Sequence, residues 1–196
     1  APDIMTMAKF LVEDGRCRWA FSGSMLGTQF KGVRSYPVGY VHELRMFPLD
    51  FEEFCWAIGV SEGARQTIRD ACISERPIPD YIHDAMMANF RTYTVVGGMP
   101  EVVQRFLDTQ GDLASVRQLQ SELNEQYRRD ISKYASGRAL QVQSIYDQLP
   151  IMLEGENKRF VLNSIDPKAH YEKYQRDFVW LVDAGVALKA DIVTEP

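Results

Sequence analysis

The sequence has few cysteines and no long apolar run. Cys17, Cys55 and Cys72 are odd in number and lack CxxC spacing, which argues against a disulfide framework or a zinc ribbon and favours a reducing cytoplasm. No apolar stretch reaches the length of a membrane span, and the N-terminus lacks the basic and apolar regions of a signal peptide. We therefore expect a cytoplasmic protein with no membrane partner.

An excess of positive charge is also missing. The chain has 22 Lys and Arg residues against 27 Asp and Glu residues, and its formal net charge is −5. Sequence-independent binding of nucleic acid relies on Lys and Arg that neutralise phosphates, so we do not expect it over the whole surface. The composition, 45% hydrophobic and 25% charged, is typical of a soluble globular protein, and the length of 196 residues favours one core with a smaller appended module.

Complete motifs for phosphate, metal or nucleophile chemistry are absent from the sequence. Residues 27–34 (GTQFKGVR) contain the two glycines of a phosphate loop, but Val33 and Arg34 stand where Lys and Ser or Thr are required. The three histidines lie far apart without metal-ligand spacing, so we expect no metal site. Ser22 and Ser24 flank a glycine but do not form the GxSxG motif of a hydrolase.

Helical patterns with clear start and stop signals fill most of the chain after residue 50. Asp50 and Glu53 form a capping box that predicts a helix from Phe51. Pro100 suits the first turn of a helix, and Asp112 precedes a long apolar stripe. Other helices are predicted from Asp3 to about Gly15, from Ser61 to about Ile73, from Ile82 to Gly97, from Arg138 to Leu149 and from Pro167 to Ala184.

Three apolar segments predict strands. Residues 17–22 indicate a short buried strand, and residues 40–47 indicate a second one. We expect these two strands to lie parallel in one sheet, because a crossover joins them. Residues 186–193 predict a third strand, which gives the helix, helix, strand order of a winged helix-turn-helix at the end of the chain.

Five phrases of the sequence carry a resemblance to a known family. They are FSGSMLG at 21–27, SYPVG at 35–39, LRMFPLDFEEF at 44–54, VGGMPEVV at 96–103 and YRRDI at 127–131. In this order they resemble prokaryotic AAA-like P-loop ATPases, related to the STAND and archaeal ATPases, which usually carry a C-terminal domain of unknown function. The resemblance spans nearly the whole chain. It implies an α/β P-loop core remnant in residues 1–75, a mainly α-helical lid in residues 76–137 and a winged helix in residues 138–196.

The resemblance also implies the residues of a nucleotide site. Ser22 and Ser24 resemble the sensor 1 residues, which would act in catalysis beside the γ-phosphate and the attacking water. Gly98 and Pro100 resemble a lid element that packs beside the nucleotide base. Hydroxyl groups can orient water, and a glycine-proline corner lets the backbone approach a ring. A plain turn between two helices is the alternative interpretation of Gly98 and Pro100.

The phosphate loop and the Walker B acids of the family are missing, and the chain begins at Ala1 without Met, so it is interpreted as an internal fragment. The complete protein is expected to bind ATP and Mg²⁺, whereas this chain alone should hold neither tightly and should not hydrolyse ATP. The predicted function is the sensor and lid part of a nucleotide-driven switch.

The alternative function is a winged-helix module that binds DNA or a protein without its own catalysis. The helix from Pro167 to Ala184 would make the contact. Its positive charge is interrupted by two acids, so a solvated helix face is a further interpretation. The basic residues are Lys168, His170, Lys173 and Arg176, and the acids are Glu172 and Asp177.

Overall fold

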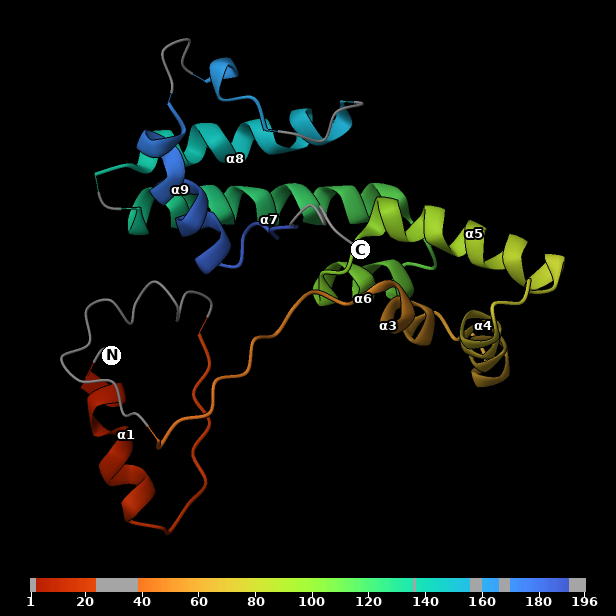
Figure 1. Ribbon diagram of the computed structural model, residues 1–196, viewed down its shortest axis with the longest axis horizontal. Coiled ribbons are helices and arrows are strands. Elements are labelled where there is room, and N and C mark those ends of the chain that lie inside the picture. The colour runs from red at the N-terminus through yellow and green to blue at the C-terminus, as the bar shows by residue number, and fades with distance from the viewer. Residues whose placement is uncertain (1–2, 24–38, 136, 156–159, 166–169, 191–196) are drawn as a thin grey trace. The chain divides into compact units, whose positions relative to one another are not determined.

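The computed structural model describes residues 3–23, 39–135, 137–155, 160–165 and 170–190, and these residues are helical or lack regular structure (Figure 1). The described α-helices are α1 (Asp3–Glu13), α3 (Phe51–Ala57), α4 (Glu62–Ser74), α5 (Asp80–Val96), α6 (Pro100–Asp108), α7 (Leu113–Tyr134), α8 (Ala139–Glu154) and α9 (Tyr171–Asp183), with a 3-10 turn η2 at Leu162–Ser164. None of these helices combines the length and the apolar character that crossing a bilayer requires.

The chain divides into two compact units. Unit 1 comprises Ala1–Arg45 and Gln126–Pro196, and unit 2 is Met46–Glu125. Helix α7 starts in unit 2 and ends in unit 1, so it contributes side chains to the core of each.

The predicted α/β P-loop core remnant is wrong, because the part of the chain that the structure describes contains no β-strand. Residues 17–22 and 40–47 have no backbone hydrogen bond to another described residue. Trp19 is 46% exposed and Leu44 is 80% exposed. An apolar segment gives a strand only where neighbouring strands supply hydrogen bonds and a face to cover, and the described residues supply neither to these two segments.

The predicted winged helix is wrong as well, since residues 186–190 form no strand; residues 191–193 lie outside the described part. The backbone N–H of Val186 instead donates to the carbonyl oxygen of Leu181 at 3.0 Å, and that of Gly185 donates to Val182 at 3.0 Å. This is the Schellman pattern that ends a helix, and Gly185 has the positive φ of 71° that it needs. Val186 therefore packs as part of the α9 cap.

Three of the predicted helix starts are confirmed by capping bonds, whereas the helix predicted from Pro167 begins at Tyr171. The N–H of Glu53 donates to Asp50 Oδ1 at 2.8 Å, and the N–H of Asp50 donates to Glu53 Oε2 at 2.9 Å, which completes the capping box of α3. Ser61 Oγ accepts from the N–H of Ala64 at 3.3 Å. Asp112 Oδ1 accepts from Ala114 at 3.0 Å.

Each unit contains an apolar core. The core of unit 2 consists of Phe54, Val96, Val102, Val103, Val116 and Leu119, from α3, α5, α6 and α7. The core of the C-terminal part of unit 1 consists of Ile131, Ala135, Val142, Ile145, Tyr174 and Leu181, with η2 and the α9 cap packed against it.

Candidate functional site

The corner between α5 and α6 contains two of the residues predicted to contact nucleotide, Gly98 and Pro100. Helix α5 ends at Val96, and Gly97 follows with φ of 78° and ψ of −175°. Residues with a side chain rarely adopt this conformation, so Gly97 makes the turn possible. Pro100 then takes the first position of α6, where its missing N–H costs nothing.

Gly98 is packed against the backbone of Leu49. The N–H of Leu49 donates to the carbonyl oxygen of Gly98 at 2.7 Å. A Cβ atom built on Gly98 would lie 2.0 Å from the carbonyl oxygen of Leu49, a separation that no real Cβ contact shows. The chain therefore needs glycine at position 98 for its own packing, whatever ligand the corner meets.

Two side chains bond to the backbone at or near this contact. Tyr93 Oη donates to the carbonyl oxygen of Leu49 at 2.8 Å. Gln120 Nε2 donates to the carbonyl oxygens of Val95 and Val96 at 2.9 Å and 3.1 Å, and so satisfies the C-terminal end of α5. Burial raises the pKa of the Tyr93 hydroxyl, and the negative charges of Asp50 and Glu53 raise it further. Tyr93 therefore stays a hydrogen-bond donor at neutral pH.

The outer side of the corner is open to solvent. Pro100 and Glu101 are exposed, whereas Val102 and Val103 point into the core. The corner can offer the ring of Pro100 to a flat ligand. The acidic Glu101, in the first turn of α6, would repel a phosphate group there.

The structure describes only one of the two predicted sensor serines. Ser22 is exposed, lacks regular secondary structure and belongs to unit 1, whereas Gly98 and Pro100 belong to unit 2. Ser24 lies outside the described residues. The structure thus brings Gly98 and Pro100 to one corner, and a catalytic role for the two serines stays a prediction.

The described residues contain no group of three or more His, Cys, Asp or Glu side chains that could hold a metal ion. Cys17, Cys55 and Cys72 are free thiols. Burial raises the pKa of the Cys55 thiol, an effect that the charge of Arg65 partly opposes. Cys55, which is buried on α3, therefore favours its protonated form.

An ion pair between Arg138 and Asp177 was missed by the sequence interpretation, which placed Asp177 on a solvated helix face. Asp177 is 2% exposed. It accepts from Arg138 Nε at 2.7 Å and from Nη2 at 2.5 Å, and Nη2 also donates to the carbonyl oxygen of Lys173 at 3.0 Å. The bond to Asp177 raises the pKa of Arg138. The signal was the helical spacing, since Asp177 lies between Tyr174 and Leu181 on the apolar stripe.

A protein-family model described as "Domain of unknown function (DUF8612)" matches residues 87–196, which is more than half of the chain. The match begins within α5 and covers the α5–α6 corner and every later helix. Comparison with curated proteins and with solved structures finds no match.

Proposed function

The chain belongs to the DUF8612 family, and we propose that it is the lid of an ATP-dependent switch, with the α5–α6 corner of unit 2 contacting the nucleotide base. One observation carries the proposal: the contact between Leu49 and Gly98 joins two of the phrases that resemble the AAA-like ATPases, residues 44–54 and 96–103. Those phrases lie far apart in sequence, yet they are joined at Gly98, two residues before the exposed Pro100.

The residues at the corner suit a base better than a phosphate. Pro100 offers an apolar ring edge, and the nearby acids Asp50, Glu53 and Glu101 disfavour the phosphates. Phosphate and Mg²⁺ would be held by Walker motifs, which these 196 residues do not contain. The chain alone would then bind ATP with a millimolar Kd and would not hydrolyse it. A cytoplasmic location belongs to the same proposal, supported by the three free thiols.

A titration of the isotope-labelled 196-residue protein with ATP, followed by amide NMR shifts, tests the proposal. We expect shifts that are centred on residues 97–103 and Leu49, that are nearly the same with adenosine, and that do not depend on Mg²⁺. Shifts spread evenly over the chain, or none at millimolar ATP, would contradict it. Micromolar affinity would reveal a phosphate site elsewhere in the chain and would also contradict it.

Pro100→Ala and Pro79→Ala form a matched pair for that titration. Both prolines are exposed and lie beside opposite ends of the α5 helix, Pro79 as its N-cap and Pro100 beyond its C-terminus. Alanine is tolerated at the first helical position, which Pro100 occupies, and Pro79 makes no side-chain cap bond that alanine would lose, so both variants should stay folded. Pro100→Ala should weaken the ATP-dependent shifts, and Pro79→Ala should leave them unchanged.

The alternative function, binding of DNA or a protein through α9, stays a prediction. Lys173, Arg176 and His170 are exposed, while Lys168 lies outside the described residues. Asp177 does not interrupt the positive charge on the surface of α9, because it is buried against Arg138. A gel shift with duplex DNA at low and moderate salt tests the DNA form of this hypothesis, since phosphate contacts weaken steeply with salt.

A further inference from the structure

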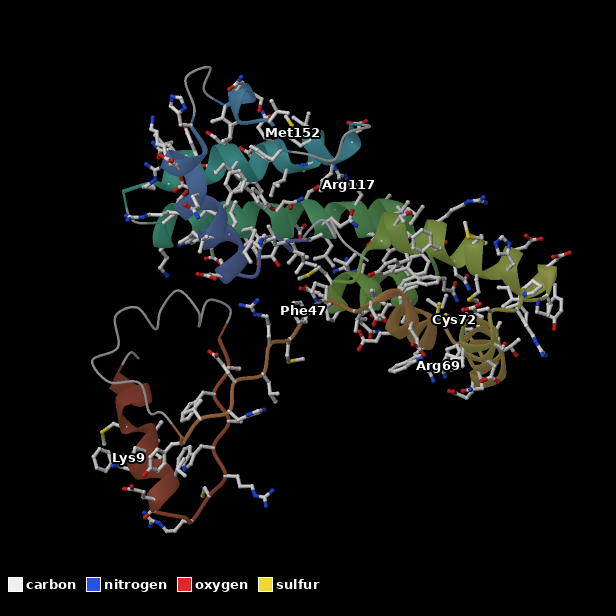
Figure 2. The ribbon with its side chains drawn as sticks, viewed as in Figure 1. Lys9, Phe47, Arg69, Cys72, Arg117 and Met152 are labelled. Carbon is white, nitrogen blue, oxygen red and sulfur yellow. The ribbon has the colours of Figure 1, made fainter. Side chains whose placement is uncertain are left out.

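Residues 41–47 contain no helix and precede α3 in the chain (Figure 1). Leu44 is 80% exposed and Met46 is 94% exposed, and Phe47, labelled in Figure 2, is also largely exposed. The backbone N–H and carbonyl groups of this stretch bond to no other described residue. Backbone groups without partners can pair with those of another strand.

Both ends of the stretch are held by other parts of the chain. At one end, Tyr40 Oη donates to Glu13 Oε1 at 3.0 Å, and the ammonium group of Lys9 lies 5.6 Å from the centre of the Tyr40 ring. At the other end, Leu49 bonds to Gly98. The first contact lies within unit 1 and the second within unit 2, so each one holds its own end of the stretch.

The order of the charges identifies the pairing partner. Glu43 and Arg45 flank Leu44, and neither forms an ion pair within the described part of the chain. In an antiparallel pair of identical strands centred on Leu44, Glu43 of each copy lies directly opposite Arg45 of the other. The same register places Leu44 opposite Leu44 and Val41 opposite Phe47. Opposite charges and apolar side chains in facing positions stabilise a strand pair.

We propose that a second copy of this chain binds residues 41–47 as an antiparallel two-stranded ribbon, so that the protein forms a two-fold symmetric dimer. Two-fold symmetry requires a self-complementary surface, and the sequence Glu43, Leu44, Arg45 provides one. Pro48, which has no N–H, ends the pairing at each side. This interface is independent of the nucleotide proposal, because it involves neither the α5–α6 corner nor a ligand.

Other pairings of the same stretch are less favourable. A parallel in-register pair would set Glu43 beside Glu43 and Arg45 beside Arg45, and like charges in these positions destabilise a strand pair. A slip of one residue in the antiparallel pair would place Glu43 opposite Leu44, which loses both ion pairs. The charge pattern therefore selects one direction and one register.

Sedimentation equilibrium of the full 196-residue chain tests the dimer. We expect a concentration-dependent monomer and dimer equilibrium in the wild type. Glu43→Arg and Arg45→Glu each place like charges opposite one another, so each should raise the dimer Kd by roughly tenfold or more. The double variant Glu43→Arg with Arg45→Glu restores opposite charges and should return the Kd close to the wild-type value.

Leu44→Pro tests the backbone part of the interface, with Leu188→Pro as its control. Both leucines are strongly exposed and lie outside helices, so neither change removes packing from the monomer. Leu44→Pro should abolish the dimer, because the proline removes an N–H at the centre of the ribbon. Circular dichroism checks that the helices remain. A wild type that stays monomeric at all concentrations overturns the proposal. So does a double charge variant that stays as weak as the single ones, or a Leu188→Pro variant that dissociates the dimer equally.

Discussion

The core of unit 2 and the core formed by α7, α8 and α9 share one helix, but different interactions stabilise them. Helix α7 contributes Val116 and Leu119 to the first core and Ile131 to the second. Beside the first core, two backbone segments touch at Leu49 and Gly98 with no space for a side chain. The second core contains a buried acid that is neutralised by Arg138 from the start of α8.

The backbone contact between Leu49 and Gly98 and the ion pair between Arg138 and Asp177 should respond differently to mutation. A backbone contact is intolerant of added volume but needs no particular side-chain chemistry, because interiors are packed at high density. A buried ion pair tolerates changes that remove both charges, but it fails when one partner is lost and the other is left without a counter-charge. Substitutions at these two places therefore distinguish an interaction that is limited by volume from one that depends on charge.

Gly98→Ala should have the largest effect on stability. The new Cβ would lie 2.0 Å from the carbonyl oxygen of Leu49, and neither backbone segment can move without breaking the bond between them. We expect a loss of about 4 kcal/mol in the free energy of unfolding, at the upper end of single-residue effects. Urea denaturation measures the loss, and hydrogen exchange should place it in residues 46–125.

Gly97→Ala is the control for this variant. Gly97 has a positive φ, but a Cβ there would meet nothing within 4 Å. Its cost should be the backbone strain alone, about 2 kcal/mol, because this combination of φ and ψ is nearly confined to glycine. Equal losses in the two variants would show that the contact with Leu49 is not what makes position 98 intolerant.

Arg138→Met should have the next largest effect. It keeps most of the side-chain volume but leaves the carboxylate of Asp177 buried without its partner, which should cost about 3 kcal/mol. Arg128→Met is the control, because Arg128 pairs with Asp147 at 3.0 Å where both side chains are partly exposed, and such pairs contribute about 0.5 kcal/mol.

A second variant decides whether charge is the cause. Arg138→Met combined with Asp177→Leu removes both charges, and it should recover most of the stability that Arg138→Met loses. A double variant that stays as unstable as the single one would mean that the loss came from packing, for example of Arg138 over the ring of Tyr174.

Tyr93→Phe should have a smaller effect, about 1 kcal/mol, because it removes one hydrogen bond, to the carbonyl oxygen of Leu49. The bond also predicts a pH dependence. The folded-state pKa of Tyr93 is raised, mainly by burial, so its contribution is fully present below the ordinary tyrosine pKa of about 10. It is lost as the pH rises through the higher folded value. The stability difference between wild type and Tyr93→Phe should therefore be constant from pH 7 to 9 and shrink at higher pH.

Local features of this fold could be predicted from the sequence, whereas features that depend on distant partners could not. The capping residues Asp50 and Ser61 act within three residues of themselves, so their spacing is sufficient. The apolar pattern of residues 17–22 indicated a strand, but a strand depends on neighbours that the pattern does not contain. Leu49 and Gly98 meet across a long separation, and nothing in either phrase alone indicates that contact. The burial of Asp177 could be predicted from its place on the α9 stripe, but its pairing with the distant Arg138 could not.

Gly63→Ala should have the smallest effect, and the change should be stabilising. Gly63 lies in the first turn of α4, a helix of unit 2 in which no residue is fully buried. The change therefore tests a region away from both the contact of Leu49 with Gly98 and the ion pair of Arg138 with Asp177. An added Cβ would meet nothing within 4 Å, and alanine restricts the unfolded chain more than glycine does. We expect a gain of about 0.5 kcal/mol in the free energy of unfolding, because the helix end is less sensitive to propensity than its middle. Thermal unfolding should show a rise of roughly 2 °C in Tm if α4 unfolds together with the core of unit 2. Slower hydrogen exchange in α4 with an unchanged Tm would contradict that expectation, and it would show that α4 opens separately from the core closed by Leu49 and Gly98.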